Sequence, residues 1–297
     1  MTEHSLTAAD GRVIPVHAWQ PESPVAILVI AHGMAEHAGR YEPLARWLMT
    51  RQIAVIAADH RGHGPGCAPE DLGFFAARNG WDKVVEDLHQ VVDYAHTLAP
   101  GKPLTLLGHS MGSFVAQAYI QRYADSLDAL LLSATNRINR PALTLSGGLV
   151  SLIKALKGPR HISPMINNLT FGAFNKAFRP NRTTHDWLSR DNAQVDRYLA
   201  DPYCGFPCTT QLWRDFIGGM LTIRPSVWPR NLPIHLIAGT DDPVGEMGKG
   251  VRRHVADIRA AGVNVASVRL FEGARHELIN ESNAAEVWEY VLGCLEV

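Results

Sequence analysis

The sequence predicts an α/β fold in which helices cover both faces of a mostly parallel sheet and a helical cap interrupts that sheet. Two regions alternate short apolar runs with helical patterns, and continuous Val/Ile/Leu runs are typical of strands buried on both faces. Residues 136–230 between them contain many Pro, Asn, Arg and aromatic residues and no apolar strand run. The resumed part has too few strands to fold alone, so an inserted cap is favoured over a second domain.

This pattern predicts three segments: a first core part at 1–135, a cap at 136–230 and a second core part at 231–297. The alternating segments on either side of Asp10-Gly11 predict an antiparallel edge hairpin. Apolar runs then predict a buried strand at 25–33 and further strands at 53–60, 103–108, 127–134, 232–239 and 264–273. Three-four spacing of apolar residues predicts helices at 41–52, 81–99, 113–124, 248–262 and 283–296.

Composition and charge exclude several classes of protein. The chain has 297 residues, 46% hydrophobic and 19% charged, with a formal net charge of -1, so a nucleic-acid partner is not expected. No run of eighteen apolar residues suggests a membrane span, and the N-terminal stretch "MTEHSLTAADG" lacks the apolar core of a signal peptide. We therefore expect a cytoplasmic protein with reduced thiols at Cys67, Cys204, Cys208 and Cys294.

A serine lies between two glycines where a strand pattern becomes a helix pattern. In "LTLLGHSMGSFVA", Gly108 and Gly112 leave room for a sharp turn that pushes the Ser110 oxygen out above the sheet. The helix that follows points its positive N-terminal end at that oxygen. A serine hydroxyl needs a base that is oriented by a third group before it becomes a useful nucleophile. Ser110 is therefore the predicted nucleophile.

The resumed sheet supplies an acid and a base in the order that this fold requires. The strand at 232–239 is followed by Asp241 and Asp242, and the next strand is followed by His276. Because parallel strands end at the same edge of the sheet, these groups are expected to meet Ser110 there. Both aspartates are candidates for the acid on this reasoning alone.

Backbone amides are expected to form the oxyanion hole. The amide of Met111 follows the nucleophile directly, and the amide of Met34 lies in the loop after the first parallel strand. Neither a metal nor a cofactor is predicted, because "HGMAEH" lacks the helical HExxH spacing and "DHRGHGPG" lacks the GxGxxG order. Asp59, Arg61 and His63 are instead expected to hold their loop by hydrogen bonds.

These motifs together resemble the α/β-hydrolase fold, and within it the monoacylglycerol lipase and lysophospholipase group. The stretches "HGMAEHAGRYEPLARWL", "DHRGHG", "GHSMG", "GTDDPV" and "EGARHELINE" follow the group's order, and "LSRDNAQVDRYLADPYCG" looks like its cap segment. The resemblance implies a mostly parallel eight-stranded sheet. It also places the acid at the fourth residue of the G-[ST]-x-D pattern, which is Asp242, and leaves Asp241 to hydrogen-bond the turn. Val244-Gly245 stands where some relatives carry a cysteine, so thiol sensitivity is not expected to carry over.

The implied activity is a serine esterase or lipase that cleaves monoacylglycerols or lysophospholipids through an acyl-enzyme. The apolar stretch at 142–158 is expected to line an acyl channel and touch a membrane surface transiently, although an ordinary buried cap helix is an equal alternative. A wide apolar roof is expected from Phe171, Phe174, Phe178, Trp187, Trp213, Phe216 and Trp228.

Two other functions stay open from the sequence. A short-chain carboxylesterase or aminopeptidase would use the same scaffold, and the aminopeptidase would need a cap carboxylate such as Asp186, Asp191, Asp196, Asp201 or Asp215. A hydrolase-like receptor that turns over once is the alternative from a different class. The sequence carries no signal for an oligomeric state.

Overall fold

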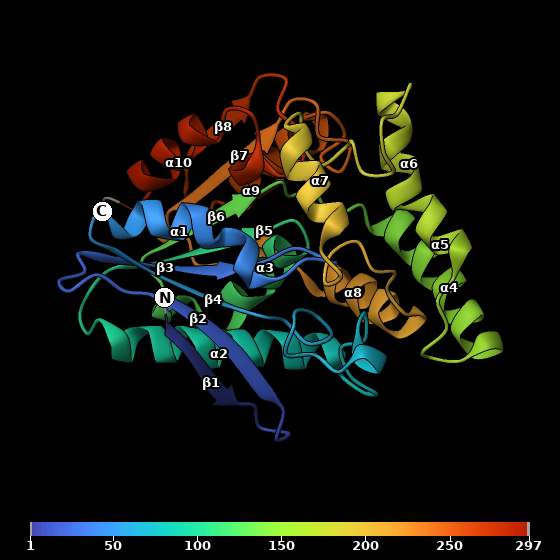
Figure 1. Ribbon diagram of the computed structural model, residues 1–297, viewed down its shortest axis with the longest axis horizontal. Coiled ribbons are helices and arrows are strands. Elements are labelled where there is room, and N and C mark those ends of the chain that lie inside the picture. Colours follow the sequence, from blue (N-terminus) through green and yellow to red (C-terminus); the bar gives the residue numbers. More distant parts are fainter. Residues whose placement is uncertain (1, 296–297) are drawn as a thin grey trace.

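The computed structural model describes residues 2–295, which form one eight-stranded sheet in the order β1-β2-β4-β3-β5-β6-β7-β8 (Figure 1). The strands are β1 (Thr2–Thr7), β2 (Val13–Trp19), β3 (Ala26–Ala31), β4 (Ile53–Ala58), β5 (Leu104–His109), β6 (Ala129–Ser133), β7 (Ile234–Gly239) and β8 (Val265–Phe271). β2 is antiparallel to both β1 and β4, and the remaining neighbours are parallel. The predicted edge hairpin is confirmed.

Helices cover both faces of the sheet, as the buried strands require. α1 (Glu42–Met49) and α10 (Ala284–Gly293) bury their apolar residues against one face. α2 (Gly80–Leu98), α3 (Met111–Tyr123) and α9 (Lys249–Ala260) cover the other. Every residue of β3, β4, β5 and β6 is buried, which explains their unbroken apolar sequences. The predicted α/β fold class is confirmed.

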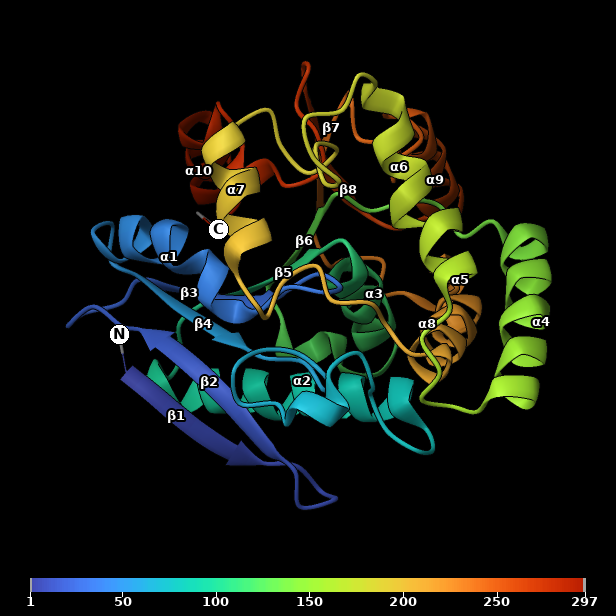
Figure 2. The same cartoon turned by 45° about the vertical axis from the view of Figure 1, so that its right-hand side comes forward.

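The segment between β6 and β7 contains five helices and contributes no strand to the sheet. They are α4 (Arg140–Lys157), α5 (Pro164–Leu169), α6 (Phe171–Asn175), α7 (Asn192–Ala200) and α8 (Thr210–Thr222). Four of these helices have an N-cap residue whose side chain accepts a hydrogen bond from a backbone N–H of the first turn: Asn139, Ser163, Asp191 and Thr209. Figure 2 shows α4 at the periphery, with α8 between it and the core. On this order of elements we propose the division into 1–135, 136–230 and 231–297.

The cap packs on the core where α8 crosses α2, and the two helices are in close contact at this crossing. Gly219 of α8 lies against the indole of Trp81 in α2, and a Cβ at Gly219 would overlap that ring. Trp81 is buried and also contacts Phe216, with ring centroids 6.0 Å apart. The neighbouring Gly218 faces only the flexible end of Arg214, 3.1 Å from a built Cβ. A side chain is therefore excluded by the Trp81 ring at Gly219 but could be accommodated at Gly218 by a movement of Arg214.

We predict that Gly219→Ala destabilises the protein whereas Gly218→Ala does not. Both changes gain up to about 1 kcal/mol of helix propensity, but only the first forces α8 away from Trp81, at a cost of about 1–3 kcal/mol. Urea denaturation of the two variants and the parent measures the difference in the free energy of unfolding. Equal stability of the two variants would contradict the tight crossing.

Candidate active site

Ser110 lies in a strained turn between β5 and α3. Its φ of 51° and ψ of -118° are rare for a residue with a side chain. The Ser110 N–H donates to the Ser133 carbonyl of β6 at 2.9 Å, and the Ser110 carbonyl accepts the Ser113 N–H at 2.9 Å. These bonds hold the turn on both sides. The strand-turn-helix junction predicted from the sequence is present, and it directs the Ser110 hydroxyl toward the loop after β8.

The two glycines that flank Ser110 are required by space. A Cβ at Gly108 would meet the Gly112 carbonyl oxygen at 2.5 Å and the Ser113 Cα at 2.7 Å. A Cβ at Gly112 would overlap the carbonyl oxygen of Ala31, the last residue of β3. The first turn of α3 can therefore lie directly against β3 and β5 only because both residues lack a side chain.

The structure brings the three predicted side chains together. His276 Nε2 lies 2.8 Å from Ser110 Oγ, and His276 Nδ1 lies 2.9 Å from Asp242 Oδ2. Because an ionised carboxylate only accepts, Nδ1 carries the proton and donates it to Asp242, and Nε2 accepts from the Ser110 hydroxyl. Asp242 is fully buried and His276 is 3% exposed, so water does not compete for the hydrogen bond between them.

The neighbouring Asp241 is not part of this chain. It is exposed, and its carboxylate accepts a hydrogen bond from the Thr240 hydroxyl at 3.3 Å. Its backbone N–H donates to the Ala274 carbonyl at 3.0 Å, which ties the loop after β7 to the loop after β8. Of the two aspartates that the sequence offers, only Asp242 reaches His276 in this structure.

The electrostatics around His276 favour the charged imidazole. Burial alone lowers its pKa, but the charge and the hydrogen bond of Asp242 outweigh the burial and raise the pKa above its ordinary value. His109 lies nearby, with ring centroids 5.0 Å apart, and burial lowers its pKa well below the ordinary value. Of these two neighbouring rings, only His276 has a pKa raised above the ordinary value of a histidine.

The backbone amides of Met34 and Met111 are the two predicted components of the oxyanion hole. Within residues 2–295 the N–H groups of Met34 and Met111 donate to no acceptor. The preceding amide of Gly33 is already engaged, since it donates to Glu36 Oε1 at 2.5 Å. A Cβ built on Gly33 would lie 3.3 Å from the Ser110 Cβ, so this loop and the nucleophile are in close approach. Met34, Ser110 and Met111 all line the same cavity.

That cavity has a volume of about 470 Å³ and lies between the core and the cap. Its walls beyond Ser110 are mainly apolar side chains of α4, α5, α6 and α8, including Leu143, Val150, Ile166, Ile217 and Met220. Within the described residues, Glu246 is the only carboxylate that lines it. The cavity therefore suits an apolar chain with an ester near Ser110.

The predicted aromatic roof is correct in part. Phe171, Phe174, Trp187, Trp213 and Phe216 line the cavity. Phe178 does not, because its ring packs under the Arg275 guanidinium at 4.1 Å. Trp228 does not either, because it is buried beside His254 of α9, with ring centroids 6.2 Å apart. An aromatic residue in the cap sequence thus serves packing as readily as it lines the cavity.

Residues of the stretches "HGMAEH" and "DHRGHGPG" make hydrogen bonds to the backbone of these two loops. His32 Nδ1 lies 2.8 Å from the Gly33 carbonyl, and its Nε2 accepts the His60 N–H at 3.0 Å. Asp59 Oδ1 accepts the Ala38 N–H at 2.8 Å, and His63 Nδ1 lies 2.8 Å from the Arg61 carbonyl. These contacts agree with the predicted role of Asp59 and His63 in holding their loop.

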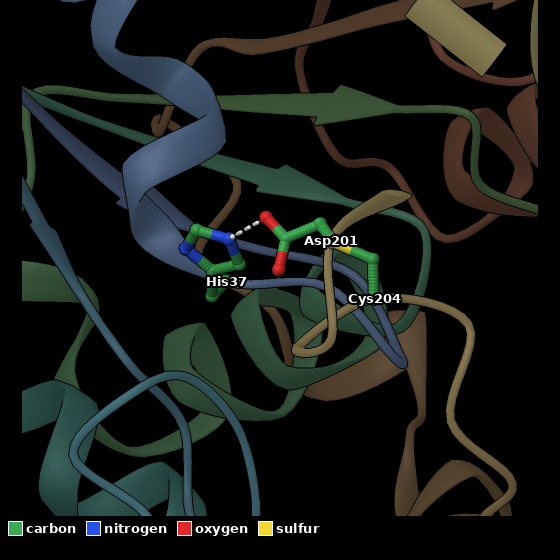
Figure 3. Close-up of side chains that lie close together, drawn as sticks. All are labelled: His37, Asp201 and Cys204. Atoms are coloured by element: carbon green, nitrogen blue, oxygen red, sulfur yellow. Dashed lines mark hydrogen bonds and ion pairs between the residues drawn. The ribbon is translucent and has the colours of Figure 1, made fainter. Parts of the chain in front are cut away.

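A second group of potential ligands, His37, Asp201 and Cys204, lies close together (Figure 3). His37 Nδ1 accepts the Gly39 N–H at 3.2 Å, so the proton of a neutral ring lies on Nε2 and is donated to Asp201 at 2.9 Å. A metal at Nε2 would need the opposite tautomer. Burial raises the pKa of the Cys204 thiol, which also disfavours a thiolate ligand. The His37–Asp201 pair therefore joins the cap to the core.

Motif spacing alone missed the buried charges that surround the site. Arg40, Tyr41 and Glu277 lie inside the motifs quoted from the sequence, but the motif spacing assigned them no role. In the structure Arg40 lies between two buried carboxylates, Glu36 and Glu277. Only the tertiary contact reveals them, because the two carboxylates are far apart in the chain.

The chain is similar to known hydrolases over most of its length. The monoacylglycerol lipase of Mycolicibacterium smegmatis is 28% identical over 282 residues, which cover 94% of this chain and 91% of that protein. The monoglyceride lipase of Homo sapiens is 28% identical over 279 residues, covering 93% of this chain and 84% of that protein.

Solved structures show the same architecture. A thermostable carboxyl esterase from Bacillus coagulans, crystallised with glycerol, superposes with a TM-score of 0.89 at 23% identity and covers 99% of this chain and 98% of that one. At this identity the likeness shows the α/β-hydrolase fold. The family model Hydrolase_4, described as serine aminopeptidase, S33, matches residues 22–283. Because that match spans most of the chain, the protein belongs to the Hydrolase_4 family and has the α/β-hydrolase fold.

Proposed function

We propose that this carboxylic ester hydrolase cleaves single-chain lipid esters of the monoacylglycerol or lysophospholipid type, with Ser110, His276 and Asp242 as its catalytic triad. The observation that carries the proposal is the chain of hydrogen bonds from Ser110 through His276 to Asp242 at the base of an apolar cavity. The similarity to proteins named monoacylglycerol lipase and monoglyceride lipase supports the same substrate class.

The reaction is acyl transfer in two steps. His276 Nε2 takes the Ser110 proton as the oxygen attacks the ester carbonyl, and the amides of Met34 and Met111 bind the oxyanion. The imidazolium then protonates the leaving alcohol, which departs and leaves an acyl-enzyme on Ser110. Water, activated in the same way, releases the fatty acid. Asp242 holds the tautomer and stabilises the charged imidazole throughout.

An aminopeptidase activity on this scaffold is less well supported. Recognition of a substrate ammonium needs a carboxylate in the cavity, and none of the five cap aspartates considered from the sequence lines it. Asp186 accepts backbone N–H groups of Arg182 and Thr183, and Asp201 pairs with His37. Glu246, which does line the cavity, lies 3.2 Å from Arg253 Nη1 and so already has a cationic partner.

A substrate panel tests the proposed function. We expect steady hydrolysis of a long-chain monoacylglycerol, slower turnover of acetyl esters and none of a proline amide, since each buried methylene contributes about 0.8 kcal/mol. A preference for acetyl esters or for the amide would reject the lipid substrate. A single burst without steady turnover would favour a receptor.

The outer face of α4 is proposed to contact a lipid surface, and a cytoplasmic location beside a membrane stays a prediction. Leu145, Leu152 and Leu156 are 78%, 57% and 72% exposed and follow helical spacing. In residues 2–295 no helix combines the length and apolarity that crossing a membrane requires.

We predict that the double variant Leu145→Gln/Leu156→Gln binds phosphatidylcholine vesicles at least about 10-fold more weakly. Hydrolysis of a short soluble ester should be unchanged, and unaltered vesicle binding would reject the contact.

Replacement of the nucleophile is expected to abolish turnover without loss of the fold. We predict that Ser110→Ala lowers kcat by at least about 10³-fold. Met111→Ala is the matched control at the next residue, since it keeps the backbone amide and should retain activity within about 10-fold. Circular dichroism confirms folding of both. An equally deep loss in Met111→Ala would contradict a backbone donor.

The two adjacent aspartates are expected to behave differently. Asp242→Asn should lower kcat by about 10⁴-fold, because the amide favours the wrong imidazole tautomer, whereas Asp241→Asn should stay within about 3-fold. The reverse result would exchange their roles.

The pH profile gives a second readout. Since Asp242 raises the pKa of His276 and the base must be neutral, kcat/KM should fall as pH falls through that raised pKa. The acidic limb of the residual Asp242→Asn activity should move to lower pH.

A further inference from the structure

One guanidinium joins the loop of the oxyanion hole to the loop of the base. Arg40 Nη1 lies 2.9 Å from Glu36 Oε2 and 2.5 Å from Glu277 Oε1, and its Nη2 lies 2.6 Å from Glu277 Oε2. Glu36 is 3% and Glu277 4% exposed, so these are buried charges. We call Glu36, Arg40 and Glu277 the buried charge cluster.

Each carboxylate of the cluster is next to a group that the proposed reaction uses. Glu36 Oε1 accepts the Gly33 N–H at 2.5 Å and the Tyr41 hydroxyl at 2.9 Å. It thereby fixes the peptide that precedes the Met34 amide. Glu277 directly follows His276 in the chain, and both of its oxygens are bound by Arg40. The cluster therefore links the loop that carries the Met34 amide to the loop that carries His276.

The cluster also contacts the cap. The Arg40 guanidinium lies 4.8 Å from the ring centroid of Tyr198 in α7, and the Tyr198 hydroxyl donates to the Ala35 carbonyl at 2.9 Å. Three segments that are remote in sequence thus meet at one cation. Stability is a poor reason for such an arrangement, since burying charges costs several kcal/mol per ion before pairing repays it.

We propose that Glu36, Arg40 and Glu277 are positioning residues that hold the Met34 amide and His276 at the separation that acyl transfer needs. The proposal rests on the proposed function, because it assigns the Met34 amide to the oxyanion hole and His276 to the base. Misplacement of such groups by about 1 Å costs on the order of 10²-fold in rate. Loss of the cluster should therefore act on kcat rather than on KM.

The same cluster contributes to the charge around the base. The titratable and charged groups that act on His276 are Asp242, Glu277 and Glu36, and the ring of His109 lies beside it. Arg40 pairs with both glutamates. Asp242 makes the direct hydrogen bond, and the two glutamates act on the imidazole through space. A change at Glu277 should therefore be visible in the pH profile, which a merely structural role would leave in place.

The first test is Arg40→Met, with Arg46→Met as its matched control. Arg46 pairs with Glu42 on the exposed face of α1, with 57% of its side chain accessible. We expect Arg40→Met to lower kcat for a short soluble ester by about 10- to 100-fold with KM within about 3-fold, and Arg46→Met to change neither. Should Arg40→Met fail to fold, Arg40→Lys keeps the charge without the two-pronged contact. Wild-type kcat in a folded Arg40 variant would overturn the proposal.

The second test is Glu277→Gln. The acidic limb of kcat/KM should move to lower pH, because one of the negative charges that raise the pKa of His276 is gone. An unmoved limb together with wild-type kcat would overturn the proposal.

A readout without a lipid substrate separates this proposal from the proposed function. The second-order rate of Ser110 phosphonylation by a fluorophosphonate requires the triad and the oxyanion hole but no acyl cavity. Slow labelling of Arg40→Met beside fast labelling of the parent supports the cluster even if no lipid ester is cleaved. Equal labelling rates overturn the cluster alone, and a parent that is not labelled at Ser110 overturns both.

Discussion

The strained backbone at Ser110 is the constraint on which the rest of the site depends. A positive φ at a residue with a side chain costs about 1–3 kcal/mol and persists only where its surroundings enforce it. Here the Ser133 carbonyl binds the Ser110 amide, and two glycines let α3 lie against β3 and β5. The hydroxyl is consequently presented at the edge where the parallel strands end, within reach of the loops after β7 and β8.

The position of the proposed base depends on the cap as well as on the sheet. The His276 and Glu277 amides donate to carbonyls of cap residues Trp187 and Leu188 at 3.4 and 2.8 Å. Arg275 Nη1 donates to the Ser189 carbonyl at 3.1 Å. The cap segment 186–190 therefore contributes Trp187 to the lining of the cavity and also contacts the loop that carries the imidazole. Changes in the cap are expected to reach the chemistry through these backbone contacts.

Burial and pairing together distinguish one histidine from the others. Burial lowers the pKa of His60 to about 3 and that of His63 and His254 to about 4, so these rings are neutral and pack in the interior. His276 is as deeply buried, yet Asp242 raises its pKa above the ordinary value. The hydrogen bond and the charge of the buried Asp242 carboxylate therefore distinguish His276 from the other buried histidines and make it the candidate base.

The fold class and the family followed from local pattern, because buried strands, amphipathic helices and a serine between glycines each leave a mark on neighbouring residues. Parallel strands end at one edge of the sheet, so the order of the strands could predict that Ser110, His276 and one of two adjacent aspartates lie together. Strand order did not choose between Asp241 and Asp242; the family resemblance favoured Asp242, and in the structure it is Asp242 that contacts His276. Tertiary structure alone decided which aromatic residues line the cavity and that Arg40 joins Glu36 to Glu277. Those contacts join segments that are far apart in the sequence, and no helical or strand periodicity relates them. They form only when the cap and the loops pack together.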